Sequence, residues 1–302
     1  MWPTRFGVGG TDVDDEHLHL FEQARPSLLG LAYRILGSRA DAEDVVQDCF
    51  LKWGEADRSA IANPGGWLTT VCTRHCIDFL RAPHRALVDY VGPWLPEPIQ
   101  TVSPPGTDSK LAESLTTAFL LMLERLTPRE RAAYLLREVF DQPYPEIAAT
   151  LEMEEAACRK LVSRAHEHIG KRKVRHITPV ETQDRLLQAF QSAITSGSTD
   201  QLASLLSSDI RLTTDSGGKA IAARRILEGE EVLTVLQRAR DWWGGCTWTI
   251  TDMNGGRGAI LTNDGQPMLT LSFDYNDAGQ VSDVFITRNP EKLSRLEPVV
   301  IQ

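Results

Sequence analysis

The chain has 302 residues, 42% of them hydrophobic and 24% charged, which is enough apolar material for two or three folded domains. Its net charge of −9 excludes a protein that coats nucleic acid by bulk electrostatics, so any DNA contact has to come from local basic patches. The chain has neither an apolar secretion segment at its start nor an apolar run near the roughly 20 residues that cross a bilayer. We therefore expect a cytoplasmic protein without a membrane partner.

Five cysteines are scattered along the chain, and an odd count at irregular spacings does not predict a disulfide framework. Cys72, His75 and Cys76 are close in sequence and could bind zinc, but a structural zinc site needs four ligands and no second Cys/His pair is present. Buried small hydrophobic side chains are the favoured interpretation. We expect neither a metal nor a cofactor.

Composition divides the chain into zones. We expect a disordered leader over residues 1–15, a helical domain over 16–88, and a linker rich in Pro and Gly over 89–108. A second helical domain follows over 109–174. After a boundary at Ile177-Thr-Pro179, residues 180–296 show two helices and then alternating strands.

The first helical zone predicts helices over 26–37, 40–53 and 64–81, with Ser38 as an N-cap and Pro64 opening the third helix. The face of the second helix that is opposite its apolar stripe is acidic. It carries Asp41, Asp44 and Asp48, flanked by Glu43 and Gln47. Such a face is usually just solvated; its functional alternative is a docking surface for a basic partner helix.

The third predicted helix has an apolar stripe that includes His75. Its polar residues lie mostly away from that stripe and could contact separated DNA strands, where arginine supplies backbone charge and stacking. These residues are Thr70, Thr73, Arg74, Asp78 and Arg81.

The second helical zone contains a capping box at Thr127-Pro-Arg-Glu130. A short helix over 145–151, a turn over 152–154 and a longer helix over 155–169 then predict a helix-turn-helix. The residues expected to clamp its two helices are Ile147, Ala148, Leu151, Ala157, Leu161 and Ala165. The residues expected to face outward are Ala156, Arg159, Lys160, Ser163 and Arg164.

Small and basic side chains on that outward face suit entry into the DNA major groove. Basic residues at 171–175 would add phosphate affinity, whereas Glu154 and Glu155 would repel phosphates. An ordinary helical hairpin with a solvated basic face is the alternative.

The third zone predicts helices over 182–195 and 229–241 and a meander of strands from 246 to 287, which together make an α+β cone. Its only carboxylates that we nominate for catalysis are Asp215 and Asp252, since no histidine follows Asp184. The segment Asp215-Ser-Gly-Gly-Lys219 favours a turn with positive φ at its glycines over a catalytic role.

Several motifs resemble those of a known family. Ala-Tyr-Arg-Ile-Leu-Gly-Ser (32–38), the acidic segment 41–48 and Trp-Leu-Thr-Thr-Val (67–71) look like sigma region two. Leu126-Thr-Pro-Arg-Glu-Arg131, residues 144–148 and residues 158–165 look like sigma region four. Together they resemble an extracytoplasmic-function sigma factor. The glycine usual in the turn of the helix-turn-helix is absent, with Glu152 near its place.

The resemblance implies core RNA polymerase, through its largest-subunit coiled coil and flap region, and promoter DNA as partners. The acidic face of 40–53 would dock on the coiled coil, the helix 67–81 would melt and read the −10 element, and the helix 155–169 would read the −35 element.

Three further motifs resemble a subgroup with a fused C-terminal SnoaL-like domain, a fold that elsewhere hosts polyketide cyclases and ketosteroid isomerases. They are Trp94-Leu95-Pro96 in the linker, Asp215 with Gly217, Gly218 and Lys219, and Asn289-Pro290 with Lys292 and Leu293. The resemblance implies that this domain regulates the factor. We expect Trp94 to bury on the Asp215 and Asn289 segments; packing on its own helical domain is the alternative.

Two other functions remain open on the sequence. One is a one-component helix-turn-helix regulator with a ligand-sensing cone, which leaves the acidic helix without a role. The other is an enzyme of the cyclase or isomerase class, which needs a pocket with a perturbed carboxylate. We expect no enzymatic activity, and a small ligand in the cone remains open, as does the direction of regulation.

Overall fold

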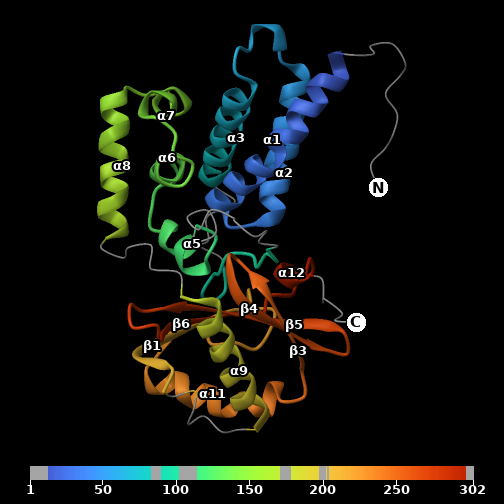
Figure 1. Cartoon of the computed structure of the whole chain (residues 1–302), viewed down its shortest axis with the longest axis vertical. Helices are drawn as coiled ribbons and strands as arrows, with labels where there is room; N and C mark the ends of the chain where they lie inside the picture. Colours follow the sequence, from blue (N-terminus) through green and yellow to red (C-terminus); the bar gives the residue numbers. More distant parts are fainter. Residues whose placement is uncertain are drawn as a thin grey trace.

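The computed structural model describes residues 13–82, 90–101, 114–170, 178–196, 202 and 204–296. Helices form one end of the molecule and a sheet domain forms the other (Figure 1). The leader up to residue 12, residues 102–113, which include the end of the expected linker, and the basic residues 171–175 lie outside the described residues. Where the leader was expected to reach residue 15, helix α1 already begins at Val13.

The first helical unit consists of α1 (Val13–Leu36), α2 (Arg39–Glu55), the short η1 (Arg58–Ala60) and α3 (Pro64–Arg81). α1 is longer than predicted, with Pro26 inside it. Its apolar face continues on the N-terminal side of the proline, because Phe21 is buried and its ring centroid lies 4.9 Å from that of Phe50. Burial of that face outweighs the hydrogen bond that a proline removes.

The second helical unit consists of α5 (Thr117–Leu123), α6 (Pro128–Glu138), α7 (Tyr144–Thr150) and α8 (Glu155–Ile169). Both halves of the capping box at Thr127 and Glu130 are present, as predicted. Glu152 has a φ of 51°, so it adopts the left-handed conformation in the turn where the family's glycine is missing.

The sheet domain confirms the predicted α+β class. It begins with α9 (Val180–Ser196) and β1 (Leu206–Asp215), followed by β2 (Leu227–Glu228) and α11 (Glu230–Trp243). The meander follows as β3 (Thr247–Met253), β4 (Gly256–Asn263), β5 (Gln266–Tyr275) and β6 (Val281–Thr287), and α12 (Pro290–Leu293) follows β6. The strand order is β2-β1-β6-β5-β4-β3, in which only the β1–β6 pair is parallel.

The two faces of the sheet have different neighbours. The helices α9 and α11 cover the face that points away from the helical units (Figure 1). Buried apolar side chains fill the space between these helices and the sheet, and they include Leu187, Phe190, Leu212, Leu236 and Trp243. The opposite face meets α5, where the Thr117 and Ser272 hydroxyl oxygens lie 3.3 Å apart.

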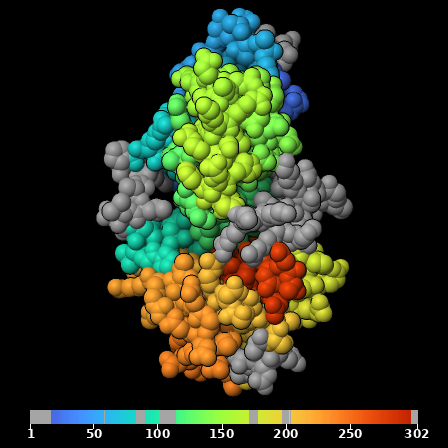
Figure 2. Space-filling view, turned by 90° about the vertical axis from the view of Figure 1, so that its left-hand side faces the viewer, coloured from blue at the N-terminus to red at the C-terminus, as the bar shows by residue number. Residues whose placement is uncertain are grey.

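The helical units are not separate modules in this structure. One continuous core joins residues of α1, α2 and α3 with residues of α5 to α8. Residues 90–101 of the linker run along the seam between the helical end and the sheet domain (Figure 2). The linker joins the sheet domain through a β-bridge between Gln100 and Met253.

Candidate interdomain site and binding faces

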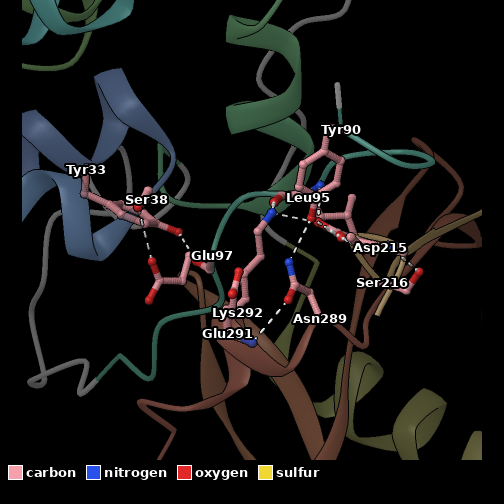
Figure 3. A network of polar contacts seen from close by, with 12 residues as sticks. Tyr33, Ser38, Tyr90, Leu95, Glu97, Asp215, Ser216, Asn289, Glu291 and Lys292 are labelled. Carbon is pink, nitrogen blue, oxygen red and sulfur yellow. Dashed lines mark hydrogen bonds and ion pairs between the residues drawn. The ribbon is translucent and has the colours of Figure 1, made fainter. Parts of the chain in front are cut away.

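A buried carboxylate lies where the linker meets the sheet domain (Figure 3). Asp215, at the C-terminal end of β1, has 0% of its surface exposed. One of its oxygens accepts from the Tyr90 hydroxyl at 2.5 Å and from the Gly217 N–H at 3.1 Å. The other accepts from the Leu95 N–H at 2.8 Å and from Lys292 Nζ at 2.7 Å. These four donors offset the desolvation of a fully buried charge.

Lys292 ties the tail of the sheet domain to the linker. Besides Asp215, its ammonium donates to the Leu95 carbonyl and lies 4.6 Å from the centre of the Trp94 ring. Burial lowers the pKa of Lys292, and the charge of Asp215 opposes that shift. The carboxylate and the aromatic face therefore stabilise the charged form of Lys292 against the effect of burial.

The loop after β1 is shaped to receive the linker. Gly217 and Gly218 have φ values of 55° and 75°, as the sequence predicted for this turn. A Cβ on Gly218 would lie 3.0 Å from the Cβ of Val91, so this close approach requires a glycine. Lys219 pairs with Glu291 at the surface.

The second segment of the sheet domain that contacts the linker is its C-terminal tail. Asn289 caps α12 by accepting from the Glu291 N–H at 3.1 Å, and its amide donates to the Tyr90 hydroxyl at 3.0 Å. Pro290 opens α12, and Leu293 is buried. Together these contacts bring the three sequence motifs into one place. Tyr90, which the sequence analysis missed, links the Asp215 and Asn289 segments.

The linker also contacts the first helical unit. Trp94 therefore packs on its own helical domain as well as on the Asn289 segment, so both placements considered for it occur together. Gly37, between α1 and α2, has a φ of 68°, and a Cβ there would lie 2.5 Å from the Trp94 ring. Leu95 and Pro96 are buried. The Glu97 N–H donates to the Gly37 carbonyl at 2.8 Å.

The Glu97 side chain accepts hydrogen bonds from backbone N–H groups at the N-terminus of α2. Its carboxylate accepts from the Arg39 N–H at 2.8 Å, where the helix has unpaired N–H groups and a partial positive charge. The Tyr33 hydroxyl donates to the Glu97 carbonyl at 2.6 Å and accepts from the Asn254 amide at 2.6 Å. Glu97 was not predicted as a site residue, although it is an acid that directly follows Trp-Leu-Pro in the sequence.

The acidic face of α2 is only partly exposed. Asp44, Gln47 and Asp48 are exposed, as predicted, and Asp48 lies 3.3 Å from the His75 ring nitrogen. Asp41, in contrast, is buried in the first turn of the helix, so its expected exposure was wrong.

Glu43 on the same face has two cationic neighbours. It lies 2.9 Å from Arg39 and 2.6 Å from Arg295 of the C-terminal tail. Burial alone would raise its pKa, but the hydrogen bonds from these two arginines hold the pKa below its usual value.

The predicted DNA face of α3 is partly covered by the second helical unit. Arg74 donates to the carbonyls of Thr150 and Ala149 at 2.8 and 2.9 Å and pairs with Glu152 at 2.8 Å. Thr70 and Thr150 lie 3.0 Å apart at their hydroxyl oxygens. The end of α7 and the turn after it therefore occupy this part of α3.

The remaining residues of that face have different surroundings. Thr73 is buried and donates to the Thr69 carbonyl at 2.8 Å, so its expected outward position was wrong. Asp78 and Arg81 are exposed.

A second contact joins the helical units, because buried Arg131 of α6 donates to the carbonyl of Ile35 on α1 at 2.7 Å.

The predicted outward face of α8 is exposed at all five positions. These are Ala156, Arg159, Lys160, Ser163 and Arg164. Ala157, expected to clamp the two helices, is also exposed, whereas Cys158 and Val162 are buried in its place. Leu161 and Ala165 are buried as expected, so only the position of Ala157 in the stripe was wrong.

Glu155 has a local role that the sequence left unexplained. It pairs with Arg159 one turn later, at 2.5 Å. The same guanidinium lies 4.3 Å from the centre of the Tyr144 ring. Arg159 is therefore preoriented by two neighbours on the helix-turn-helix.

The nominated carboxylates of the sheet domain are engaged by cations: Asp215 by Lys292, and Asp252 by Arg257 at 3.0 Å. In the part of the chain that the structure describes, no three His, Cys, Asp or Glu side chains cluster as a metal site would require. No described helix has the length and apolarity needed to traverse a bilayer.

Comparison with known proteins places these features in a family. The family described as Sigma-70 region 2 matches residues 20–86, and the family described as Sigma-70, region 4 matches residues 116–169. The ECF RNA polymerase sigma factor SigJ of Mycobacterium tuberculosis is 37% identical over 227 residues, covering 72% of each chain. The probable ECF sigma factor SigI of the same species is 27% identical over 277 residues, covering 90% of this chain and 93% of SigI.

A solved structure extends the likeness to the sheet domain. The crystal structure of M. tuberculosis SigJ matches with a TM-score of 0.71 and 33% identity, over 92% of this chain and 98% of that one. Two sigma regions and a C-terminal α+β domain thus follow one another as in that protein. This chain belongs to the extracytoplasmic-function family of RNA polymerase sigma factors.

Proposed function

We propose that α8 reads the −35 element and that core RNA polymerase docks on the exposed carboxylates of α2. The observation that carries the proposal is the outward face of α8, where Arg159, Lys160 and Arg164 are exposed on the second helix of a helix-turn-helix. Arginine and lysine there can reach guanine edges and phosphates. On α2 we assign docking to Asp44, Gln47 and Asp48, with Glu43 at their edge, and leave out buried Asp41.

We assign reading of the −10 element to α3, and this assignment requires a conformational change. Arg74 is held by α7 carbonyls and by Glu152, and Thr70 by Thr150. Separated DNA strands reach these side chains only after the second helical unit moves away. The structure therefore corresponds to a closed arrangement, and binding of polymerase and promoter supplies the energy that opens it.

We propose that the sheet domain regulates this opening through the linker. The linker contacts Asp215 and Lys292 on one side and the Gly37–Arg39 turn on the other. While both sides are engaged, the sheet domain and the polymerase-docking helix α2 are held in one geometry. Release of either side frees the chain between α3 and α5, which has to extend when the two helical units separate on DNA.

The two alternative functions have less support. A one-component regulator has no use for the region two match at residues 20–86. An enzyme needs a carboxylate that faces a substrate, but the oxygens of Asp215 are fully engaged by Tyr90, Leu95, Gly217 and Lys292. We therefore assign Asp215 to interdomain docking rather than to catalysis.

In-vitro transcription with core polymerase and a promoter library tests the proposal. Full-length protein is compared with a version that ends at Val174 and lacks the sheet domain. We expect transcripts that depend on the full-length protein, and a different promoter output from the shortened one at equal occupancy of core enzyme. Absence of factor-dependent transcripts would reject the sigma assignment, and identical output from both would reject regulation by the sheet domain.

A further inference from the structure

A cavity of about 520 Å³ lies where the linker, α5 and the sheet domain meet. It lies on the face of the sheet that meets α5, opposite α9 and α11. Its floor comes from Arg211 and Thr213 on β1 and from Asp283 and Phe285 on β6. These residues pair in register, Arg211 with Asp283 and Thr213 with Phe285, and side chains two residues apart on a strand share a face. The four side chains therefore form one continuous patch.

One face of α5 makes the wall above this floor. Ala118, Leu121 and Met122 of α5 line the cavity, and their spacing of three and four residues places them on one side of the helix. Arg125, in the turn that follows α5, also lines the cavity. The indole of Trp94 closes the cavity on the linker side, so the same side chain borders the cavity and the Lys292 contact.

The lining combines an apolar body with a net positive charge. Phe285 and Met122 are buried beside it, while the charge of Asp283 is balanced by its ion pair with Arg211, and its carboxylate also accepts from the Ser282 hydroxyl at 2.9 Å. Arg125 is exposed and gives one N–H to the Ile169 carbonyl at 3.3 Å, which leaves other donors of its guanidinium for a ligand. A cavity of this size and composition is typical of small-molecule sites.

We propose that this cavity binds an amphipathic monoanion, a molecule with an aromatic or aliphatic body and one carboxylate or sulfonate. The body packs between α5 and the strand patch, and the anionic group meets Arg125. The ligand then contacts the linker, the second helical unit and the sheet domain at once. It stabilises their docked arrangement by mass action, because separation of the units destroys the cavity. The proposal goes beyond the sigma function and does not depend on it.

Two fluorescent naphthalene probes of matched shape test the site on the full chain. One is 1-anilinonaphthalene-8-sulfonate, a monoanion, and the other is N-phenyl-1-naphthylamine, which lacks the sulfonate. The substitutions Ala118→Trp and Thr213→Phe fill the cavity from opposite walls, and Arg125→Ala removes the cation. Arg238→Ala, on the exposed side of α11, is the matched control on the far face of the sheet.

We expect saturable binding of one sulfonate probe per chain in the wild type and in Arg238→Ala. Arg125→Ala weakens the sulfonate about tenfold, the contribution of one charge-assisted hydrogen bond, and leaves the neutral probe unchanged. The two filling variants lose binding of both probes and keep the circular dichroism spectrum of the wild type. If one filling variant fails to fold, the other one, which fills the cavity from the opposite side, still tests the proposal. Equal sulfonate binding in a folded filling variant, or no saturable binding to the wild type, overturns the proposal.

Discussion

Lys292 Nζ lies 2.7 Å from a carboxylate oxygen of Asp215 and 4.6 Å from the centre of the Trp94 ring. One lysine thus joins the last helix of the sheet domain to the end of β1 and to the linker. Asp215 is fully buried, and this contact together with three N–H or O–H donors replaces the water that its carboxylate loses. This arrangement makes the docking of the linker sensitive to single substitutions.

We expect Lys292→Ala to destabilise the protein strongly. It leaves the Asp215 carboxylate buried without its cation, and breaking such a pair costs about 3–5 kcal/mol. Lys219→Ala is the matched control, since Lys219 pairs with Glu291 at the surface, where an ion pair contributes about 1 kcal/mol or less. The first transition in thermal unfolding, followed by circular dichroism, measures both. Equal melting temperatures for the two variants would contradict the role of Lys292.

Gly37→Ala tests the contact between the linker and the first helical unit. An alanine there is strained by a φ of 68° and also meets the Trp94 ring. Gly265→Ala provides the reference, because Gly265 lies in the turn between β4 and β5 with a φ of 75° and a Cβ added there would meet no atom of the described residues within 4 Å. The reference variant loses only the backbone contribution of about 1–2 kcal/mol. We expect a larger loss of unfolding free energy in urea for Gly37→Ala, and an equal loss would show that Trp94 does not press on this turn.

Reversing Asp44 and Asp48 together to lysine should remove binding to core polymerase. Both carboxylates are exposed on α2, so the fold should survive, and opposing charge at an interface costs about 2–5 kcal/mol or more. Glu55→Lys, at the exposed C-terminal end of the same helix, controls for a general change of charge. Core affinity measured at low salt decides the matter. Wild-type affinity of the double variant would remove α2 as the docking helix.

Arg164→Ala should weaken use of the −35 element by about 1–3 kcal/mol if a base contact is lost. Arg159→Ala should have the same effect, but this variant also loses the contacts of the guanidinium with Glu155 and Tyr144, and their loss has to be allowed for. Promoter binding by the holoenzyme, compared on consensus and −35-altered templates, separates loss of a base contact from loss of phosphate affinity. If Arg164→Ala binds both templates as the wild type does, the recognition-helix assignment fails.

The features that could be predicted from the sequence are those that depend on interactions between residues close together in the chain. The capping box at Thr127, the turn glycines 217 and 218 and the helix-turn-helix all depend on neighbours within a few residues. The meeting of the three linker and sheet-domain motifs was also predicted, but through family resemblance rather than from periodicity.

The contacts between units were beyond the sequence. Arg74 reaches carbonyls 75 and 76 residues away, and a polar contact to backbone has no periodic signature. Asp41 and Thr73 were placed outward because their residue types are polar, yet α2 begins beneath the linker and Thr73 satisfies its hydroxyl within its own helix. Burial of polar residues follows from which units pack together, and one helix alone does not specify that.

The most direct test concerns the closed contact between α3 and α7. The substitutions Thr70→Cys and Thr150→Cys place two thiols where the native hydroxyl oxygens lie 3.0 Å apart, and an oxidant is used to join them. Thr70→Cys alone, treated with the same oxidant, controls for the native cysteines.

Factor-dependent transcription with core polymerase is then measured before and after reduction. We predict that the oxidised double variant is inactive and that reduction restores wild-type output, because α3 has to leave α7 before it can hold separated promoter strands. Full activity of the cross-linked form would contradict the need for opening.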